Sequence, residues 1–169
     1  GPRMPHFDYL NRDKMPAASL CLDKLDEFLG NVPAGFSLGV ESRNPNYLKK
    51  EYFDLLNAHH AHHVFLQGYY MPPIAEVFAK SGAPQAENTV LRLHGPDRKG
   101  IEEKSGGEWS RIIEARDDEL HGVPKMTNAL LEQGVDVFLN VNNHYEGSAP
   151  LTIERIREML GLHQRERSR

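Results

Sequence analysis

Hydrophobic and polar residues alternate along short segments of the chain, and longer segments with a helical period separate them. The clearest alternation runs through 135–142, where valines and a leucine occupy one face and mainly polar residues the other. A period of two is typical of a β-strand. Gly147 and Pro150 then favour a turn into a helix. This stretch is therefore predicted to be a strand that leads directly into a helix.

The same two patterns repeat along the chain. Further strands are predicted over 4–9, 36–43, 62–67 and 89–94. Helices are predicted from Pro16 and over 47–58, 74–80 and 109–133, the last interrupted at Gly122 and Pro124, with a long polar loop over 95–107. Five strands separated by helices predict an α/β fold with one parallel sheet of (β/α) units.

Three of the predicted strands have unequal faces. One face is aliphatic, whereas the other is small or polar and carries charged and amide groups towards its C-terminal end. This pattern favours a barrel whose polar face lies inside and whose aliphatic face packs under helices. The sheet is therefore expected to belong to a barrel.

Length and composition set the class of protein. The 169 residues predict one domain, 1–163, followed by a basic tail, 164–169, expected to be frayed. No signal peptide and no apolar run of about 20 residues is present, and the single Cys21 is expected to be a buried thiol, so we expect a cytoplasmic protein with no membrane partner. The net charge of −4 gives no overall attraction to nucleic acid.

The segment 141–152, VNNHYEGSAPLT, resembles the C-terminal signature of the YecE-like family, also called domain of unknown function 72. Segments 7–13, 40–44, 71–74 and 92–102 are similar to that family as well. The resemblance implies a TIM-type barrel of about 250 residues, of which this chain would hold the last five strands as an incomplete barrel. It implies no particular reaction, so function has to be inferred from the site.

Polar residues at the C-terminal ends of the predicted strands form the candidate site, because parallel strands end at one edge of a sheet. They are Glu41, Arg43, Arg92, His94, Asn140, Asn142, Asn143, His144 and Tyr145. The asparagines, with His144 and Tyr145, would bind and orient a hydroxylated substrate, since amides both donate and accept hydrogen bonds. Asn142 and Asn143, which lie shortly before Gly147, can equally shape the turn.

Two of these residues are candidates for catalysis. Glu41 would act as general acid or base if partial burial raises its pKa, and His94 would transfer a proton or polarise a carbonyl. Arg43 and Arg92 would hold a carboxylate or phosphate by paired donors. The structural alternative is that Glu41 only forms a buried ion pair and His94 is an interior histidine.

A second anion site is expected after the strand over 89–94. Arg98 and Lys99 follow that strand, where barrel enzymes often bind phosphate, although a solvated basic loop fits equally. No metal site is predicted from the four histidines within 59–63, and no cofactor motif is present.

Three interpretations of function remain. The first is a barrel enzyme that acts by general acid–base chemistry on a small anionic or polyhydroxylated substrate. The second is a barrel that binds or processes nucleic acid, which the acidic net charge does not favour. The third is a non-catalytic fragment that self-associates through its open sheet edges.

Overall fold

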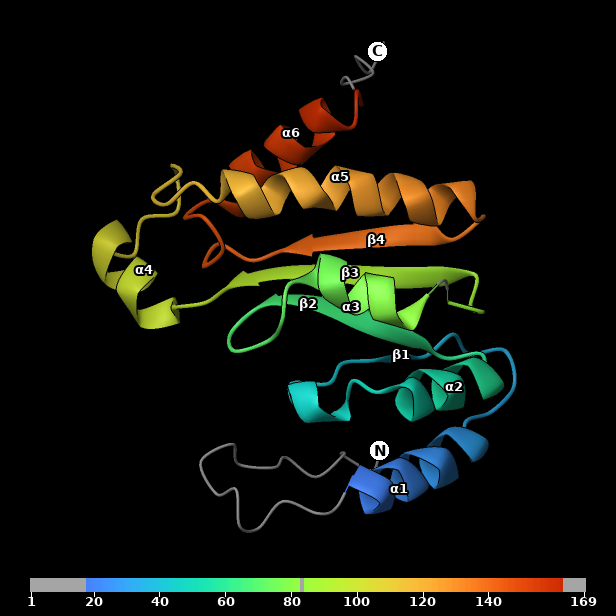
Figure 1. Ribbon diagram of the computed structural model, residues 1–169. Helices are drawn as coiled ribbons and strands as arrows, with labels where there is room; N and C mark the ends of the chain where they lie inside the picture. Colours follow the sequence, from blue (N-terminus) through green and yellow to red (C-terminus); the bar gives the residue numbers. More distant parts are fainter. Residues whose placement is uncertain (1–17, 83, 163–169) are drawn as a thin grey trace.

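The fold is a parallel sheet with helices between successive strands (Figure 1). A computed structural model describes residues 18–82 and 84–162. In chain order the elements are α1 (Ala18–Gly30), β1 (Gly39–Val40), the 3-10 helix η2 (Pro45–Tyr47), α2 (Lys50–Ala58), β2 (His62–Gly68), α3 (Ile74–Ser81), β3 (Asn88–Gly95), α4 (Arg98–Ser105), α5 (Asp117–Glu132), β4 (Asp136–Val141) and α6 (Ala149–Met159). Figure 1 shows α5 and α6 beside the β4 edge and α1 and α2 towards the β1 edge.

The α/β class and the parallel sheet are confirmed, but the number of strands is four in the described residues, not five. The strand expected over 4–9 lies outside those residues. The strand expected over 36–43 is much shorter, because only Gly39–Val40 pairs with β2. Beyond it the Asn44 side chain accepts a hydrogen bond from the Asn46 N–H at 3.0 Å and starts η2. A hydrogen bond from the nearby backbone to the Asn44 side chain thus takes the place of further pairing with β2.

The prediction of a loop over 95–107 was wrong, since α4 lies within it. The Asp97 side chain accepts a hydrogen bond from the Gly100 N–H at 3.0 Å and caps the first turn, and Gly106 ends the helix in the left-handed conformation. Only two residues of α4 are buried. The sequence of α4 therefore lacks the apolar period of a typical helix, although Asp97 and Gly106 mark its two ends.

The expected helix at 109–113 and the break at Gly122 and Pro124 were also wrong. Residues 109–113 are not helical, and α5 continues through Pro124. A proline inside a helix costs about 3 kcal/mol, whereas each fully buried large apolar side chain contributes about 1.5–3 kcal/mol. Helix α5 buries Leu120, Val123, Met126 and Leu130. Packing against the core therefore outweighs the proline.

One face of the sheet packs under the helices and forms the core. Thr89, Leu91 and Leu93 of β3 are buried on this face, and the register places Leu91 between Phe65 of β2 and Leu139 of β4. Side chains from the helices complete a single hydrophobic cluster with them. The aliphatic face expected under the helices is therefore confirmed for β3 and β4.

The opposite face carries the polar side chains. Leu66, Arg92 and Asn140 lie in one row across β2, β3 and β4. Phe138, two residues before Asn140 on the same face, is 59% exposed. This face is therefore accessible at its β4 side, and it is the face that the sequence predicts to line a barrel.

Strand β2 departs from that division, because two of its polar residues face the helices. His63 Nδ1 lies 2.9 Å from the Tyr52 hydroxyl, and Gln67 Oε1 accepts a hydrogen bond from the Ile74 N–H at 3.0 Å. Both side chains are buried and have partners. They support the core and the start of α3.

Two glycines bring the strand ends into contact. Gly68 has φ +133° and a Cβ built there would lie 2.5 Å from the Gly95 carbonyl oxygen. Gly95 has φ +78°, and its Cβ would collide with the His144 carbonyl oxygen. A side chain at either position would push the β2, β3 and post-β4 segments apart.

We expect Gly95→Ala to destabilise the protein by roughly 2–4 kcal/mol, because the left-handed backbone and the clash with His144 add together. Gly134→Ala is the matched control, since Gly134 has φ +76° but nothing within 4 Å of a Cβ. It should cost only about 1 kcal/mol. Urea unfolding of both variants measures the difference, and equal losses would contradict the close approach.

Burial lowers the pKa of His63 to about 4. The unfolded chain, with a pKa near 6.5, then binds more protons, so stability falls as the pH drops from 6.5 to 4. The loss attributable to His63 should be roughly 3 kcal/mol. Urea unfolding against pH should show a shallower dependence for His63→Gln than for the wild type. An unchanged slope would refute the assignment.

Candidate functional site

Glu41 holds two arginines together at the C-terminal edge of the sheet. Its Oε1 accepts a hydrogen bond from Arg43 Nε at 2.7 Å, and its Oε2 accepts one from Arg92 Nη1. The Glu41 side chain is only 18% exposed. Predicted residues from β3 and the segment after β1 are therefore in direct contact.

The charge state of Glu41 decides its role. Burial by itself would raise its pKa, but the hydrogen bonds and charges of Arg43 and Arg92 outweigh burial and hold the pKa below its usual range. The raised pKa on which a general acid would depend is not found. Glu41 is a carboxylate that orients two guanidinium groups.

His94 is joined to this cluster through Tyr69. The Tyr69 hydroxyl lies 3.1 Å from His94 Nδ1, and the two rings stack with their centroids 5.2 Å apart. The Arg43 guanidinium carbon lies 5.0 Å from the centre of the Tyr69 ring. Tyr69 thus links Arg43 to His94, a role that was not predicted from the sequence.

The backbone of Tyr69 explains how the ring reaches this position. Its φ is +54°, which is unusual for an aromatic residue. The sheet register shifts between Gln67 and Gly68, and the Tyr69 N–H donates to the Gly95 carbonyl at 3.1 Å. The strained conformation is held by the neighbouring strand, as is common at functional sites.

The environment keeps His94 neutral at physiological pH. Burial lowers its pKa first, and Arg92 and Arg43 lower it further, against the opposing charge of Glu41. A neutral imidazole can accept a proton. His94 therefore has the charge state that a general base requires.

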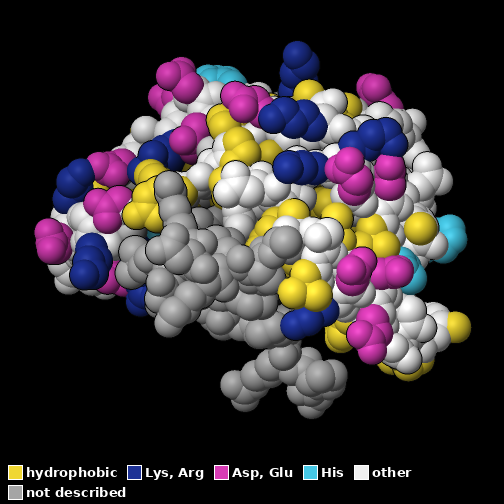
Figure 2. Space-filling view, turned by 60° about the horizontal axis from the view of Figure 1, so that its bottom comes forward, with side chains coloured by type: hydrophobic (Ala, Val, Ile, Leu, Met, Phe, Trp, Pro, Cys, Tyr) yellow, Lys and Arg dark blue, Asp and Glu magenta, His cyan; other side chains and the backbone are white. Residues whose placement is uncertain are grey.

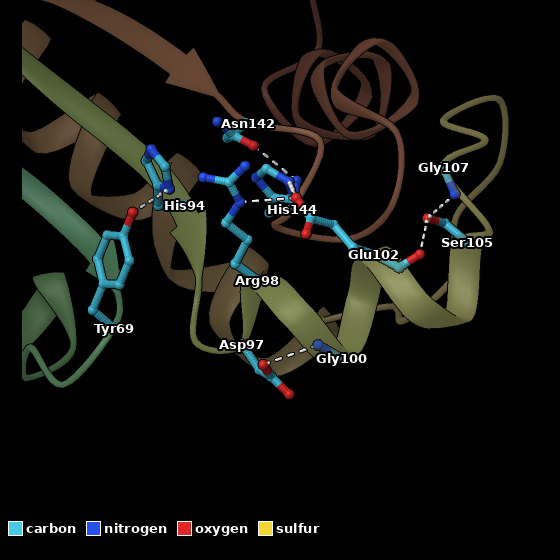
Figure 3. Close-up of polar contacts among 10 residues, drawn as sticks. All are labelled: Tyr69, His94, Asp97, Arg98, Gly100, Glu102, Ser105, Gly107, Asn142 and His144. Carbon is cyan, nitrogen blue, oxygen red and sulfur yellow. Dashed lines mark hydrogen bonds and ion pairs between the residues drawn. The ribbon is translucent and has the colours of Figure 1, made fainter.

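A second cluster lies next to His94, on α4 and the segment after β4 (Figure 3). Glu102 Oε1 accepts hydrogen bonds from Arg98 Nε at 2.8 Å and from His144 Nε2 at 3.0 Å. The Trp109 ring packs edge-on against His144, with centroids 5.2 Å apart. Asn142 Oδ1 accepts the His144 backbone N–H at 2.9 Å. Sequence reasoning missed Glu102, because the helix that brings it near Arg98 was predicted as loop.

Of the remaining predicted residues, Asn143 and Tyr145 are engaged outside these clusters. Asn143 Oδ1 accepts the Ala149 N–H at 2.8 Å and shapes the turn before α6. Tyr145 is fully buried, and its hydroxyl donates to Glu119 at 3.1 Å. Asn140 is exposed on the open face, in the row of Arg92.

The start of α4 is less open to phosphate than its sequence indicates. The Asp97 carboxylate already caps the first turn through Gly100, and Arg98 is paired with Glu102. Lys99 is exposed. Arg98 lies beside the histidines shown in Figure 3.

A buried carboxylate that the sequence analysis did not single out fixes the turn after β4. Glu146 is fully buried and accepts hydrogen bonds from the Arg116 N–H at 2.8 Å, the Thr152 hydroxyl at 2.6 Å and the Arg155 guanidinium. Its carbonyl accepts the Ile113 N–H at 2.6 Å. These partners lie in the segment before α5 and in α6. Glu146 therefore holds the 111–116 segment and α6 onto the strand end that carries His144.

Part of the segment 69–73 lines a cavity whose lining does not include His94. The cavity has a volume of about 370 Å³ and is lined by Pro45, Leu48, Phe53, Tyr70, Met71, Pro72, Val77 and Lys80.

Across 18–82 and 84–162, no three His, Cys, Asp or Glu side chains gather closely enough to hold a metal ion. In the same ranges no helix is long and apolar enough to cross a membrane.

These features define an α/β protein with a parallel sheet and a polar site where its strands end. The chain belongs to the family described as Protein of unknown function DUF72, whose model matches residues 12–169. The resemblance to the YecE-like family is thereby confirmed. No curated protein matches the chain.

Solved structures of the same family share the fold. A DUF72 family protein from Thermotoga maritima MSB8 has a TM-score of 0.58 at 18% identity, over 83% of this chain and 51% of that chain. Two structures of a DUF72 family protein from Enterococcus faecalis V583 have TM-scores of 0.57 and 0.54 at 13% and 14% identity, over 85% and 93% of this chain and 52% and 57% of those chains. The chain thus spans about half the length of these relatives.

The coupling of Glu41 and Arg92 to His94 predicts pKa changes of opposite sign. Glu41→Gln removes a negative charge that favours the imidazolium and should lower the pKa of His94. Arg92→Gln should raise it, each by several tenths of a unit to about one unit. NMR titration of the His94 ring measures both. Glu132→Gln, at the exposed end of α5, should change nothing, and shifts of the same sign in both site variants would disprove the coupling.

Proposed function

We propose that this protein is an enzyme that acts by general acid–base chemistry on a small anionic substrate at the C-terminal edge of the sheet. We further propose that the sheet is part of a TIM-type barrel, in which active sites lie at that edge. Parallel strands separated by helices, and family relatives about twice as long, support the barrel.

The observation that carries the proposal is the set of two arginines held by Glu41 beside a neutral histidine. Arg43 Nε and Arg92 Nη1 bind Glu41, which leaves other guanidinium N–H groups for a substrate anion. In the tautomer whose Nδ1–H donates to the Tyr69 hydroxyl oxygen, His94 Nε2 carries the lone pair and is the atom that would take the proton.

The other polar groups fit the same role. Asn140 and the Asn142 amide nitrogen would bind hydroxyl groups of the substrate, because amides match both donors and acceptors. In the two neighbouring clusters taken together, the guanidinium groups of Arg43, Arg92 and Arg98 stand against the carboxylates of Glu41 and Glu102. The cluster is thus net positive in a chain whose net charge is −4, and it favours an anion over a neutral ligand.

Nucleic acid is the less favoured ligand. On the face shown in Figure 2, basic and acidic side chains are interspersed, and no basic stripe is formed. The chain as a whole is acidic. Nucleic-acid binding relies on clustered positive charge that tracks the phosphates, so we favour a small anion.

Titration with inorganic phosphate, followed by NMR of the His94 ring, tests the binding half of the proposal. Phosphate should shift the His94 signals in a saturable manner and raise the pKa of His94, because a nearby anion favours the imidazolium. Arg92→Gln should weaken binding about tenfold or more. Lys125→Gln, which removes an equal charge from an exposed position on α5, is the control. Equal phosphate affinity in the wild type and Arg92→Gln would rule out the proposed anion site.

A further inference from the structure

A third guanidinium, that of Arg98, lies near the candidate site and is held by Glu102, not by Glu41. Arg98 and His144 share the Oε1 atom of Glu102, so Arg98 is held next to His144. Figure 3 shows the Arg98 side chain directed towards the region between His94 and His144. The end of β3 touches this segment, because Gly95 abuts the His144 carbonyl oxygen.

Electrostatic couplings connect His94 with members of both clusters. The charges of Arg92, Arg43 and His144 each act on the pKa of His94. Arg98 and Tyr69 are also close enough to interact electrostatically. Arg43 and Arg92 thus act directly on the imidazole, whereas Arg98 is connected to it through Tyr69 and His144.

Arg98 is available to a ligand. Its side chain is 69% exposed, and the ion pair with Glu102 joins residues four apart on one helix. Such exposed pairs are weak and are readily exchanged for a better partner. The pair uses Nε, so the two terminal nitrogens of Arg98 can still bind a carboxylate or phosphate.

We propose that the site binds a small molecule with an anionic group at each end, one held by Arg43 and Arg92 and the other by Arg98, with the reacting centre between them at His94. This inference rests on the proposed function and specifies the substrate class for the same site. Arg98 is then the residue that distinguishes a substrate with two anionic groups from one with a single anion.

A second consequence concerns charge. Three guanidiniums against the carboxylates of Glu41 and Glu102 leave one uncompensated positive charge. A ligand with two anionic groups exceeds that charge, and protonation of His94 would restore the balance. Binding of such a ligand should therefore be accompanied by proton uptake at His94.

Calorimetric titration of the full chain with acetate, inorganic phosphate and 2-phosphoglycolate at fixed ionic strength tests the inference. The wild type should bind 2-phosphoglycolate at least about tenfold more tightly than either single anion. Arg98→Gln should remove this advantage, and Arg98→Lys should restore part of it, because lysine keeps the charge but not the paired donors. Repeating the titration in buffers of different ionisation enthalpy measures the proton uptake.

Lys125→Gln is the matched control, since it removes the same charge from an exposed position on α5. It should leave the tenfold advantage intact, and an equal loss in Lys125→Gln and Arg98→Gln would overturn the inference. Phosphate binding that depends on Arg92 without any gain for 2-phosphoglycolate would overturn the inference and leave the proposed function standing. Failure of every anion to bind would overturn both. Circular dichroism of each variant verifies that it is folded.

Discussion

The close approach of three backbone segments underlies the candidate site, because it brings the ends of β2, β3 and the segment after β4 together. Gly68 abuts Gly95, and Gly95 abuts the carbonyl of His144. The residues that follow or flank these contacts are Tyr69, His94 and His144 itself. The polar groups of three elements therefore meet because glycine removes the Cβ atoms that would separate their backbones.

That packing holds Tyr69, whose backbone is strained, where its ring contacts both His94 and Arg43. A left-handed conformation for Tyr69 costs of order 1–3 kcal/mol. The hydrogen bond to the Gly95 carbonyl, the stack on His94 and the contact with Arg43 each contribute on the order of 0.5–1.5 kcal/mol. The strain and the compensating contacts are comparable in size. The ring position is consequently determined by the neighbouring strand and not by local preference.

The segment after β4 combines two duties in adjacent residues. Asn143, Tyr145 and Glu146 are engaged with backbone or buried partners and hold the turn, α5 and α6 in place. His144 alternates with them and faces Glu102. This motif is therefore mainly a scaffold, and His144 joins it to the candidate site through Glu102.

The sequence by itself determined the α/β class, the parallel order of the strands and the position of Glu41, Arg92 and His94 at one edge. These follow from hydrophobic periodicity, which is a local property, and from the rule that parallel strands end together. Its family resemblance was likewise carried by contiguous motifs.

Only the tertiary structure decided the rest. Helix α4 has little apolar period, and α5 keeps Pro124 because distant core contacts outweigh a local penalty. The pairing of Glu41 with Arg92, which helps to keep it a carboxylate, joins residues 51 positions apart. Charge state and side-chain partnership depend on neighbours in space, and the spacing of residues along a chain does not encode them.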